Sequence, residues 1–283
     1  MRRAALVIFT ILTVSGVGAA FADPTLVTQC RQTITDGVLT TDLDCASANG
    51  FALRINYGGS LDLGGHTLIG TADYGQVSSP DLSGAVACSD GCTIRNGTIA
   101  APEGLPVGAW RSHGIYDEGF GKGTVTVDNV TFVGWTGTGV TGRRVVISNS
   151  TLSGNKTGVS SSHRLTIDSS NFHGNVRGLQ ASRKARLVNV SITNSGESGA
   201  YFTGRGELSN SLVSGSGDIG VFGRVRALGS VIENSCLNSS QPSFCADIVA
   251  MPGGRPRLDA TSTCGTSLVW DDTPRSFLVC TMD

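Results

Sequence analysis

Basic residues recur along this chain at a step of about 20 residues, and their side chains could together bind an anion. They fall at the same offset before a repeated apolar residue, and no acidic residue occupies any of these positions: Arg143-Arg144, His163-Arg164, Arg183-Lys184, Gly204-Arg205 and Arg224-Val225. Guanidinium and ammonium groups bind carboxylates and sulfates by charge and by hydrogen bonds. We therefore consider Arg143, Arg144, Arg164, Arg183, Lys184, Arg205 and Arg224 candidate ligand-binding residues.

A second candidate group lies earlier, where Trp110 precedes His113 by three residues and Asp117 follows it by four. Histidine with a carboxylate can perform acid–base chemistry, so His113 and Asp117 are candidate catalytic residues. Trp110 offers a flat face for stacking against a sugar. Arg164 and Lys184 are further catalytic candidates, as bases of a lyase. The alternative is an ordinary ordered loop with Trp110 folded onto the wall of the protein.

The elements that position these residues follow from a six-residue phrase: an apolar residue, a spacer, Asn or a small residue, two spacers and a second apolar residue. Its first apolar residues step by 20, 20, 20 and 21 residues, and Leu228 follows 20 later: Val127, Ile147, Ile167, Leu187 and Leu208. A second column keeps the same register: Gly139-Val140, Gly158-Val159, Gly178-Leu179, Gly199-Ala200 and Gly220-Val221. Two columns in one register indicate a repeat protein.

A step near 20 residues is too short for paired-helix repeats, and the apolar residues come in short runs between turns rich in Gly, Ser, Asn and Thr. Three short strands and three turns fit this length, which is one coil of a parallel β-helix. Asn at the third position of the phrase tolerates the left-handed backbone of a tight turn, and its amides could hydrogen-bond from coil to coil. The same position holds Gly65, Asn96, Asn129, Asn149, Ser169, Asn189, Asn210 and Ser230.

The segments Leu61-Asp62-Leu63-Gly64-Gly65-His66-Thr67-Leu68 and Ile94-Arg95-Asn96-Gly97-Thr98-Ile99, with the later phrases, resemble the parallel β-helix repeats of the pectate-lyase-like superfamily. The resemblance spans roughly residues 38–235. It implies an all-β, right-handed parallel β-helix, here of about eight coils. It implies little about activity, because this scaffold carries lyases, hydrolases, epimerases and non-catalytic binders.

Most enzyme signatures of this scaffold are missing. The chain has neither the Asn-Thr-Asp nor, in its coils, the adjacent aspartates of polygalacturonase-like hydrolases, and it lacks the Asp-Pro-His-Glu of alginate-epimerase-like enzymes. The regular coils are poor in the clustered aspartates of calcium-dependent pectate lyases. The four histidines fall in different columns, so we predict no metal site and no cofactor.

Residues 1–22 read as a secretory signal peptide, with Arg2-Arg3, an apolar stretch and Ala20-Phe21-Ala22 before Asp23. We expect no membrane span after signal cleavage, and a secreted, periplasmic or cell-surface location. The remaining divisions are an N-terminal cap and first coil at 23–62, coils at 63–235 and a C-terminal cap at 236–283.

The eight cysteines divide evenly between the two ends, and an exported chain with an even count predicts disulfides. We predict local pairs: Cys30–Cys45, Cys88–Cys92, Cys236–Cys245 and Cys264–Cys280. Such bonds would tie the caps that close the open ends of a β-helix. A metal site at Cys88 and Cys92 is the alternative, but no nearby Cys/His pair completes it.

Charge is unevenly distributed. Without Arg2 and Arg3 the chain has 19 basic and 22 acidic residues, a net charge of −3, whereas residues 140–230 hold eleven basic and four acidic residues. The leading hypothesis is therefore an exported protein that binds an acidic polysaccharide along the basic turns, with lyase-type cleavage left open. The alternative is a non-catalytic envelope or adhesive scaffold, in which the basic residues merely occupy turns and cover apolar edges. Nucleic acid is not expected as a partner because the chain is exported and not basic overall.

Overall fold

The structure is a computed structural model, and it describes residues 23–71, 82–104, 112–119, 121–235, 246–251, 256–269 and 277–278. Within these residues every regular element is a β-strand, and no helix is long and apolar enough to cross a membrane. The strands, in chain order, are β1 (Thr25–Val27), β2 (Gln32–Leu39), β3 (Leu43–Asp44), β4 (Phe51–Asp62), β5 (Thr67–Ile69), β6 (Ser83–Cys88), β7 (Cys92–Ala100), β8 (Ser112–Asp117), β9 (Val125–Val133), β10 (Thr138–Ser148), β11 (Thr151–Ser153), β12 (Thr157–Asp168), β13 (Asn171–His173), β14 (Arg177–Ala181), β15 (Lys184–Val188), β16 (Ser191–Thr193), β17 (Ser198–Ser209), β18 (Leu212–Ser214), β19 (Ile219–Leu228), β20 (Val231–Glu233), β21 (Ala246–Ala250), β22 (Arg257–Leu258), β23 (Thr263–Cys264), β24 (Ser267–Val269) and β25 (Phe277–Leu278).

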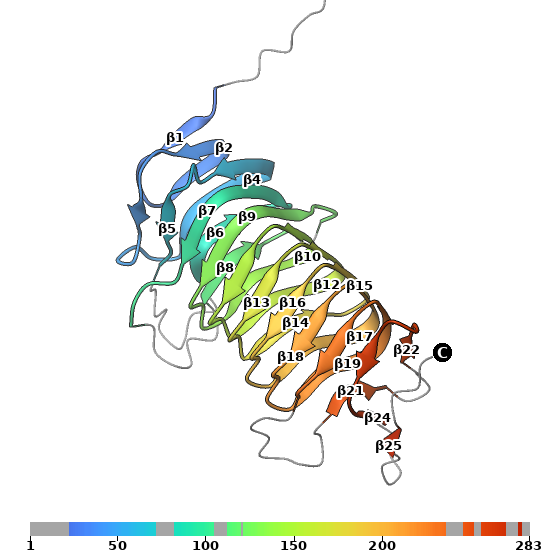
Figure 1. The fold of residues 1–283 in the computed structure, drawn as a ribbon. Helices are drawn as coiled ribbons and strands as arrows, with labels where there is room; N and C mark the ends of the chain where they lie inside the picture. Colours follow the sequence, from blue (N-terminus) through green and yellow to red (C-terminus); the bar gives the residue numbers. More distant parts are fainter. Residues whose placement is uncertain are drawn as a thin grey trace, which may run out of the picture.

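The strands form a parallel β-helix with three faces, stacked along one axis from β1 to β24 (Figure 1). The first face is the ladder β2–β4–β6–β8–β10–β12–β14–β17–β19–β21–β24. The second is β1–β2–β4–β7–β9–β10–β12–β15–β17–β19–β22. The third is β3–β5–β7–β9–β11–β13–β16–β18–β20–β23.

The described part of the chain thus gives eleven, eleven and ten strands on the three faces, more layers than the eight phrases predicted. The difference arises at the ends, where coils close without the phrase. The parallel ladder continues beyond residue 235, because β21, β22, β23 and β24 each pair in parallel with the preceding coil. Only β25 runs antiparallel, against β24.

The apolar residues of the phrase fill the core. Ile147 pairs with Ile167, Ile167 with Leu187 and Leu187 with Leu208, and all four are buried. The Gly-apolar column is confirmed in the same way, since Val140 stacks on Val159 and the column continues through Leu179, Ala200 and Val221. Apolar positions that recur once per coil therefore stack directly on one another, and the burial of these columns stabilises the solenoid.

At both ends of the β-helix the observed register differs from the one predicted from the six-residue phrase. Leu208 pairs with Ala227 and not with Leu228, so the left-handed turn residue of that coil is Gly229, with φ of 56°, and not Ser230. Near the start Ile94 pairs with Leu61, two residues before Leu63. In both cases a different small or apolar residue sits close enough in sequence to imitate the pattern.

The left-handed turn residues of the regular coils are as predicted: Asn96, Asn129, Asn149, Ser169, Asn189 and Asn210 all have positive φ. The expected ladder of amides is only partly formed. Asn129 Nδ2 donates to Asn96 Oδ1 at 3.2 Å, but Asn149 Nδ2 donates instead to Asp128 and Asn189 Nδ2 to Asp168. An aspartate one residue before the turn of the preceding coil accepts the amide more strongly than another amide would.

Two ladders of buried polar side chains, which the six-residue phrase did not predict, hydrogen-bond the turns at the ends of the third face. Backbone N–H groups donate to the serine hydroxyl of the next coil, as in Ser150 N to Ser170 Oγ at 3.1 Å and Ser211 N to Ser230 Oγ at 3.1 Å. Asn155 donates both its backbone N–H and its amide to Asn175 Oδ1 at 2.9 Å. These side chains satisfy backbone groups that the turns bury, which otherwise cost stability.

The disulfides Cys30–Cys45 and Cys88–Cys92 are formed as predicted. Cys264 is also disulfide-bonded, while its predicted partner Cys280 lies outside the described residues, as do Cys236 and Cys245. The first bond ties the chain just before β2 to the end of β3, and the second closes the turn between β6 and β7.

Replacing Ile167 by Asp tests the inward register. Ile167 is fully buried between Ile147 and Leu187, so the substitution would place an unpaired charge in the core and should lower the free energy of unfolding by more than about 4 kcal/mol. The control is Thr166→Asp, one residue earlier and pointing outward, which should melt close to the unmodified protein. Thermal unfolding followed by circular dichroism distinguishes them, and an Ile167→Asp protein that melts cooperatively near the control would contradict the register.

Candidate functional site

The basic residues form one column at the turn between the first and second faces. Arg144 pairs with Arg164, Arg164 with Lys184, Lys184 with Arg205 and Arg205 with Arg224, so five successive coils place a cation at the same position. Four steps of about 4.8 Å give a length of about 19 Å. We call the set Arg143, Arg144, Arg164, Arg183, Lys184, Arg205 and Arg224 the basic stripe.

The turn itself explains why some coils carry two basic residues and others one. A Cβ on Gly204 would lie 1.9 Å from the carbonyl oxygen of Arg183, and one on Gly223 would lie 2.0 Å from that of Phe202. Glycine is therefore required where the chain turns most tightly against the previous coil. The ladder also shifts its register between Gly142 and Arg144.

Most of the basic stripe has no counter-charge within the described residues. Arg164, Arg183, Lys184, Arg205 and Arg224 form neither a salt bridge nor a side-chain hydrogen bond there. Four arginines outside the stripe do have acidic partners: Arg54 with Glu118, Arg95 with Asp62, Arg177 with Glu197 and Arg186 with Glu207. Like charges one coil apart repel, so the stripe concentrates positive potential that an external anion would neutralise.

The first coil of the stripe is anchored by the turn before it. Arg143 Nη1 donates to the carbonyl oxygen of Gly121 at 3.0 Å, and Arg144 Nη1 donates to that of Lys122 at 3.0 Å. A carbonyl oxygen carries no net charge, so the bond to Lys122 positions the Arg144 guanidinium and leaves its positive charge in place.

His163 lies among the cations of the stripe. Its Nδ1 is buried and makes no hydrogen bond. Desolvation lowers the pKa of His163, and the positive charges of Arg183, Arg143, Arg144 and Arg164 lower it further. The imidazole is therefore neutral at pH 7, and the four guanidinium groups near it add to the effect of desolvation.

A pair of aromatic rings flanks the far end of the stripe, on the outward side of the first face. Tyr201 and Phe222 stack with ring centroids 4.7 Å apart and an angle of 5° between their planes. Tyr201 lies in register with Gln180 and Phe222 on neighbouring strands. This pair was not predicted from the sequence. A signal was present, because each aromatic residue comes directly after the apolar residue of the Gly-apolar column and the two are 21 residues apart.

His113 and Asp117 are not brought together. His113 lies in strand β8 and not in a loop, and its Nδ1 atom has no hydrogen-bond partner. The Asp117 carboxylate accepts from the backbone N–H groups of Gly91 at 3.1 Å and Gly119 at 3.3 Å. An acid–base pair of His113 and Asp117 is therefore not formed, and Trp110 lies outside the described residues.

Burial decides the protonation of both side chains. Burial lowers the pKa of His113 to about 4, although a hydrogen bond to the Thr138 backbone opposes this shift. Burial also raises the pKa of Asp117, with a smaller contribution from the negative charge of Asp90, while backbone hydrogen bonds oppose it. His113 instead packs against Tyr116, with ring centroids 5.3 Å apart, so its surroundings are those of a packed side chain.

Metal binding finds no support in the described residues, where no three His, Cys, Asp or Glu side chains gather in a way that could hold an ion.

The charges around His163 can be tested by a histidine titration. We expect NMR to give a pKa below 6.5 for His163 and a higher value in Arg183→Gln, because that substitution removes the largest of the four charge contributions. Arg95→Gln, which removes an arginine paired with Asp62, is the control and should leave the titration unchanged. A His163 pKa that does not respond to Arg183→Gln would mean that these charges do not converge.

His113 should make the protein acid-sensitive. The unfolded chain binds a proton near pH 6.5 and the folded chain only near pH 4, so stability is full above pH 6.5 and falls as the pH drops towards 4. The loss attributable to His113 is about 3 kcal/mol. Chemical denaturation at pH 7 and pH 4 should therefore show a smaller difference for His113→Thr, which introduces the residue found at the equivalent position 138. Equal differences in the two proteins would refute the assignment.

Comparisons with known proteins agree with this architecture. A family model described as a right-handed beta helix region matches residues 85–222. No curated protein matches the sequence. Among solved structures, a mutant of the periplasmic alginate epimerase AlgG is 12% identical, with 90% of this chain and 69% of that chain covered and a TM-score of 0.50. The mannuronan C-5 epimerase AlgE4 A-module of Azotobacter vinelandii is 13% identical, with 84% and 79% covered and a TM-score of 0.48. The Dettilon tailspike protein is 13% identical, with 84% and 59% covered and a TM-score of 0.41.

At such identities a structural similarity concerns the fold alone. Residues 85–222 match a right-handed β-helix region, and the described chain has the fold of a right-handed parallel β-helix.

Proposed function

We propose that this protein is exported and binds an acidic polysaccharide along the basic stripe. The observation that carries the proposal is the column from Arg144 to Arg224, in which five coils present cations in register and most of them lack a counter-charge among the described residues. A polymer with a regularly repeated anionic group matches such a column better than a small ligand, because it can meet several cations at once.

The cell compartment makes a polysaccharide the favoured polyanion. The disulfides Cys30–Cys45 and Cys88–Cys92 agree with an oxidising compartment, and the predicted signal at residues 1–22 agrees with export. A secreted, periplasmic or cell-surface location, with cap regions at 23–62 and 236–283, is part of the proposal. The similarity to polysaccharide epimerases is compatible with it but concerns only the fold.

Binding is better supported than cleavage. A lyase needs a base next to the carbon that carries the acidic group, and cations that stabilise the charge developing on that group. The stripe offers the cations, with Arg164 and Lys184 as the candidate bases. Within the described residues, His163 has no acidic partner and His113 is not paired with Asp117, so no acid–base pair accompanies them. We therefore place lyase-type cleavage second to binding.

The stripe can be tested with two variants of equal charge. The first replaces Arg144, Arg164, Lys184 and Arg205 by Gln. The control replaces four cations at other positions, Arg95, Arg177, Arg186 and Arg226, by Gln. We expect the protein to bind a uronate or sulfated polymer in a salt-dependent manner, the stripe variant to bind at least about tenfold more weakly, and the control to bind as before.

Affinity for a panel of acidic and neutral polysaccharides, measured at two salt concentrations, checks this expectation. An equal loss of affinity in both variants would mean that binding depends on the overall charge of the protein and not on the stripe. Binding to no polymer, or equally to neutral ones, would overturn the proposal and favour a non-catalytic scaffold. Incubation with any polymer that binds, followed by a test for unsaturated uronate ends, decides whether a bond is broken.

A further inference from the structure

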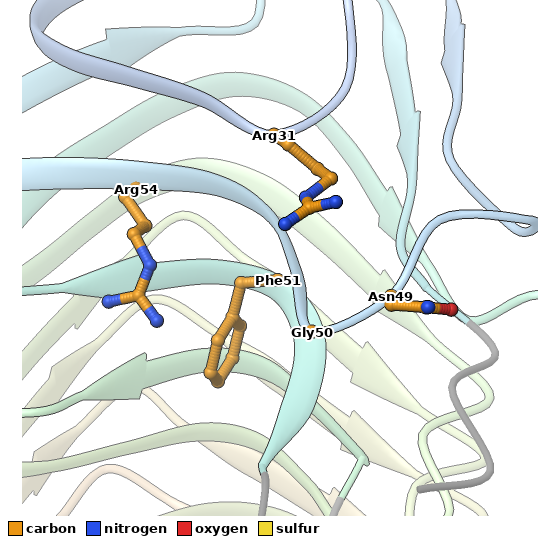
Figure 2. Close-up of a pocket in the computed structure, with 5 residues that line it drawn as sticks. All are labelled: Arg31, Asn49, Gly50, Phe51 and Arg54. Carbon is orange, nitrogen blue, oxygen red and sulfur yellow. The ribbon is translucent and has the colours of Figure 1, made fainter.

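A pocket of about 290 Å³ opens near the N-terminal end of the first face, away from the basic stripe. It is lined by Arg31, Asn49, Gly50, Phe51 and Arg54 (Figure 2). Figure 2 shows the guanidinium groups of Arg31 and Arg54 pointing toward the space around the Phe51 ring, whereas the Asn49 side chain points away from it. The volume lies at the lower end of the range for small-ligand sites.

Arg31 is held in a conformation that costs energy. Its φ is 65°, in the left-handed region that a long side chain rarely adopts. The backbone N–H of Arg31 donates to the carbonyl oxygen of Ala52, and the neighbouring Cys30 is tied to Cys45 by a disulfide. The surrounding structure thus fixes this residue, and the guanidinium is directed before any ligand arrives.

The charge in the pocket is only partly neutralised. Arg31 is exposed, and its side chain forms no hydrogen bond or salt bridge within the described residues. Arg54 pairs with Glu118 and lies over the Phe51 ring, 5.9 Å from its centroid. Glu118 therefore neutralises Arg54 and not Arg31, which leaves the positive charge of Arg31 for a ligand to meet.

The pocket also has an apolar floor. Phe51 is 6% exposed and stacks on Tyr116, with ring centroids 6.1 Å apart. Tyr116 in turn contacts His113, which the burial of this cluster keeps neutral. Because Tyr116 and Arg54 cover most of the ring, a narrow uncharged edge of Phe51 borders the pocket, and a ligand that touches it needs an apolar group as well as an anionic one.

We propose that this pocket binds one carboxylate-bearing sugar residue, a uronic acid. The forked guanidinium group of Arg31 matches a planar carboxylate, an apolar C–H group of a sugar ring matches the accessible edge of Phe51, and the volume leaves room for a single small ligand.

The pocket is a separate site from the basic stripe. Arg54 lies in β4 and precedes Arg144 in β10 by three coils on the first face, which is about 14 Å along the axis. The inference therefore does not rest on the proposed function, since a monosaccharide could occupy the pocket whether or not a polymer lies along the stripe. If both sites are used, the pocket would hold one residue of a chain that continues toward the stripe.

The test uses glucuronate and galacturonate as probes, with glucose, acetate and inorganic phosphate for comparison. Chemical-shift changes in NMR spectra of the protein at increasing probe concentration give the affinity and the place of binding. We expect a uronate to bind in the millimolar range and to shift residues 31, 49–51 and 54, while glucose and acetate bind at least about tenfold more weakly. Phosphate binding as strong as uronate, or uronate shifts confined to other residues, would overturn the assignment.

Two substitutions probe the guanidinium groups. Arg31→Asn keeps a residue that tolerates the left-handed backbone, and Arg54→Gln removes the partner of Glu118; each should weaken uronate binding about tenfold. Arg95→Gln is the matched control, since Arg95 is another exposed arginine in a salt bridge, with Asp62. The four-residue stripe variant should bind the monosaccharide normally, which separates this proposal from the proposed function. Unchanged affinity in Arg31→Asn, with an unchanged melting temperature, would refute the pocket.

Discussion

The residue-for-residue pairing of parallel coils is the constraint on which the rest of this structure depends. Each backbone N–H and C=O on the three faces bonds to the coil before or after it, so a residue occupies the same position as its counterparts in neighbouring coils. Anything that the sequence repeats every 20 or 21 residues therefore becomes a column. Ile147, Ile167 and Leu187 form a column in the core, while Arg144, Arg164 and Lys184 form one on the surface.

This geometry makes the surface unusually sensitive to like charges. In an ordinary domain two arginines twenty residues apart lie in unrelated places, but here they lie one strand spacing apart. Arg95, Arg177 and Arg186 lie outside the stripe, and each faces an acidic residue of the preceding or next coil. The column from Arg164 to Arg224 has no such acid within the described residues, and the pKa of His163 is lowered by desolvation and then by the nearby positive charges. That contrast supports the proposal that the stripe is a binding surface and not a set of ordinary turn residues.

The two candidate sites use different physical means. The basic stripe combines many weak, evenly spaced attractions, a way to hold a polymer that can slide and rebind. The pocket around Arg31 combines one directed charge with an apolar floor and a backbone fixed by a disulfide, a way to select a single residue. Both lie beside the first face, where the half-buried rings of Tyr201 and Phe222 stack on each other. On the third face, the serine and asparagine ladders hydrogen-bond the turns of neighbouring coils to one another.

The amino-acid sequence alone determined the repeat, the fold class, the core columns, the two described disulfides and the alignment of the basic residues, because period and register are properties of sequence spacing. It could not determine where the end coils pair, and it placed Leu228 where Ala227 belongs, because several small or apolar residues imitate the phrase there. Only the tertiary structure separated His113 from Asp117, left Arg164, Lys184 and Arg205 without an acidic partner among the described residues, and brought Arg31 and Arg54 to one pocket. Those facts depend on burial and on contacts between residues with no repeated spacing, which a sequence pattern does not encode.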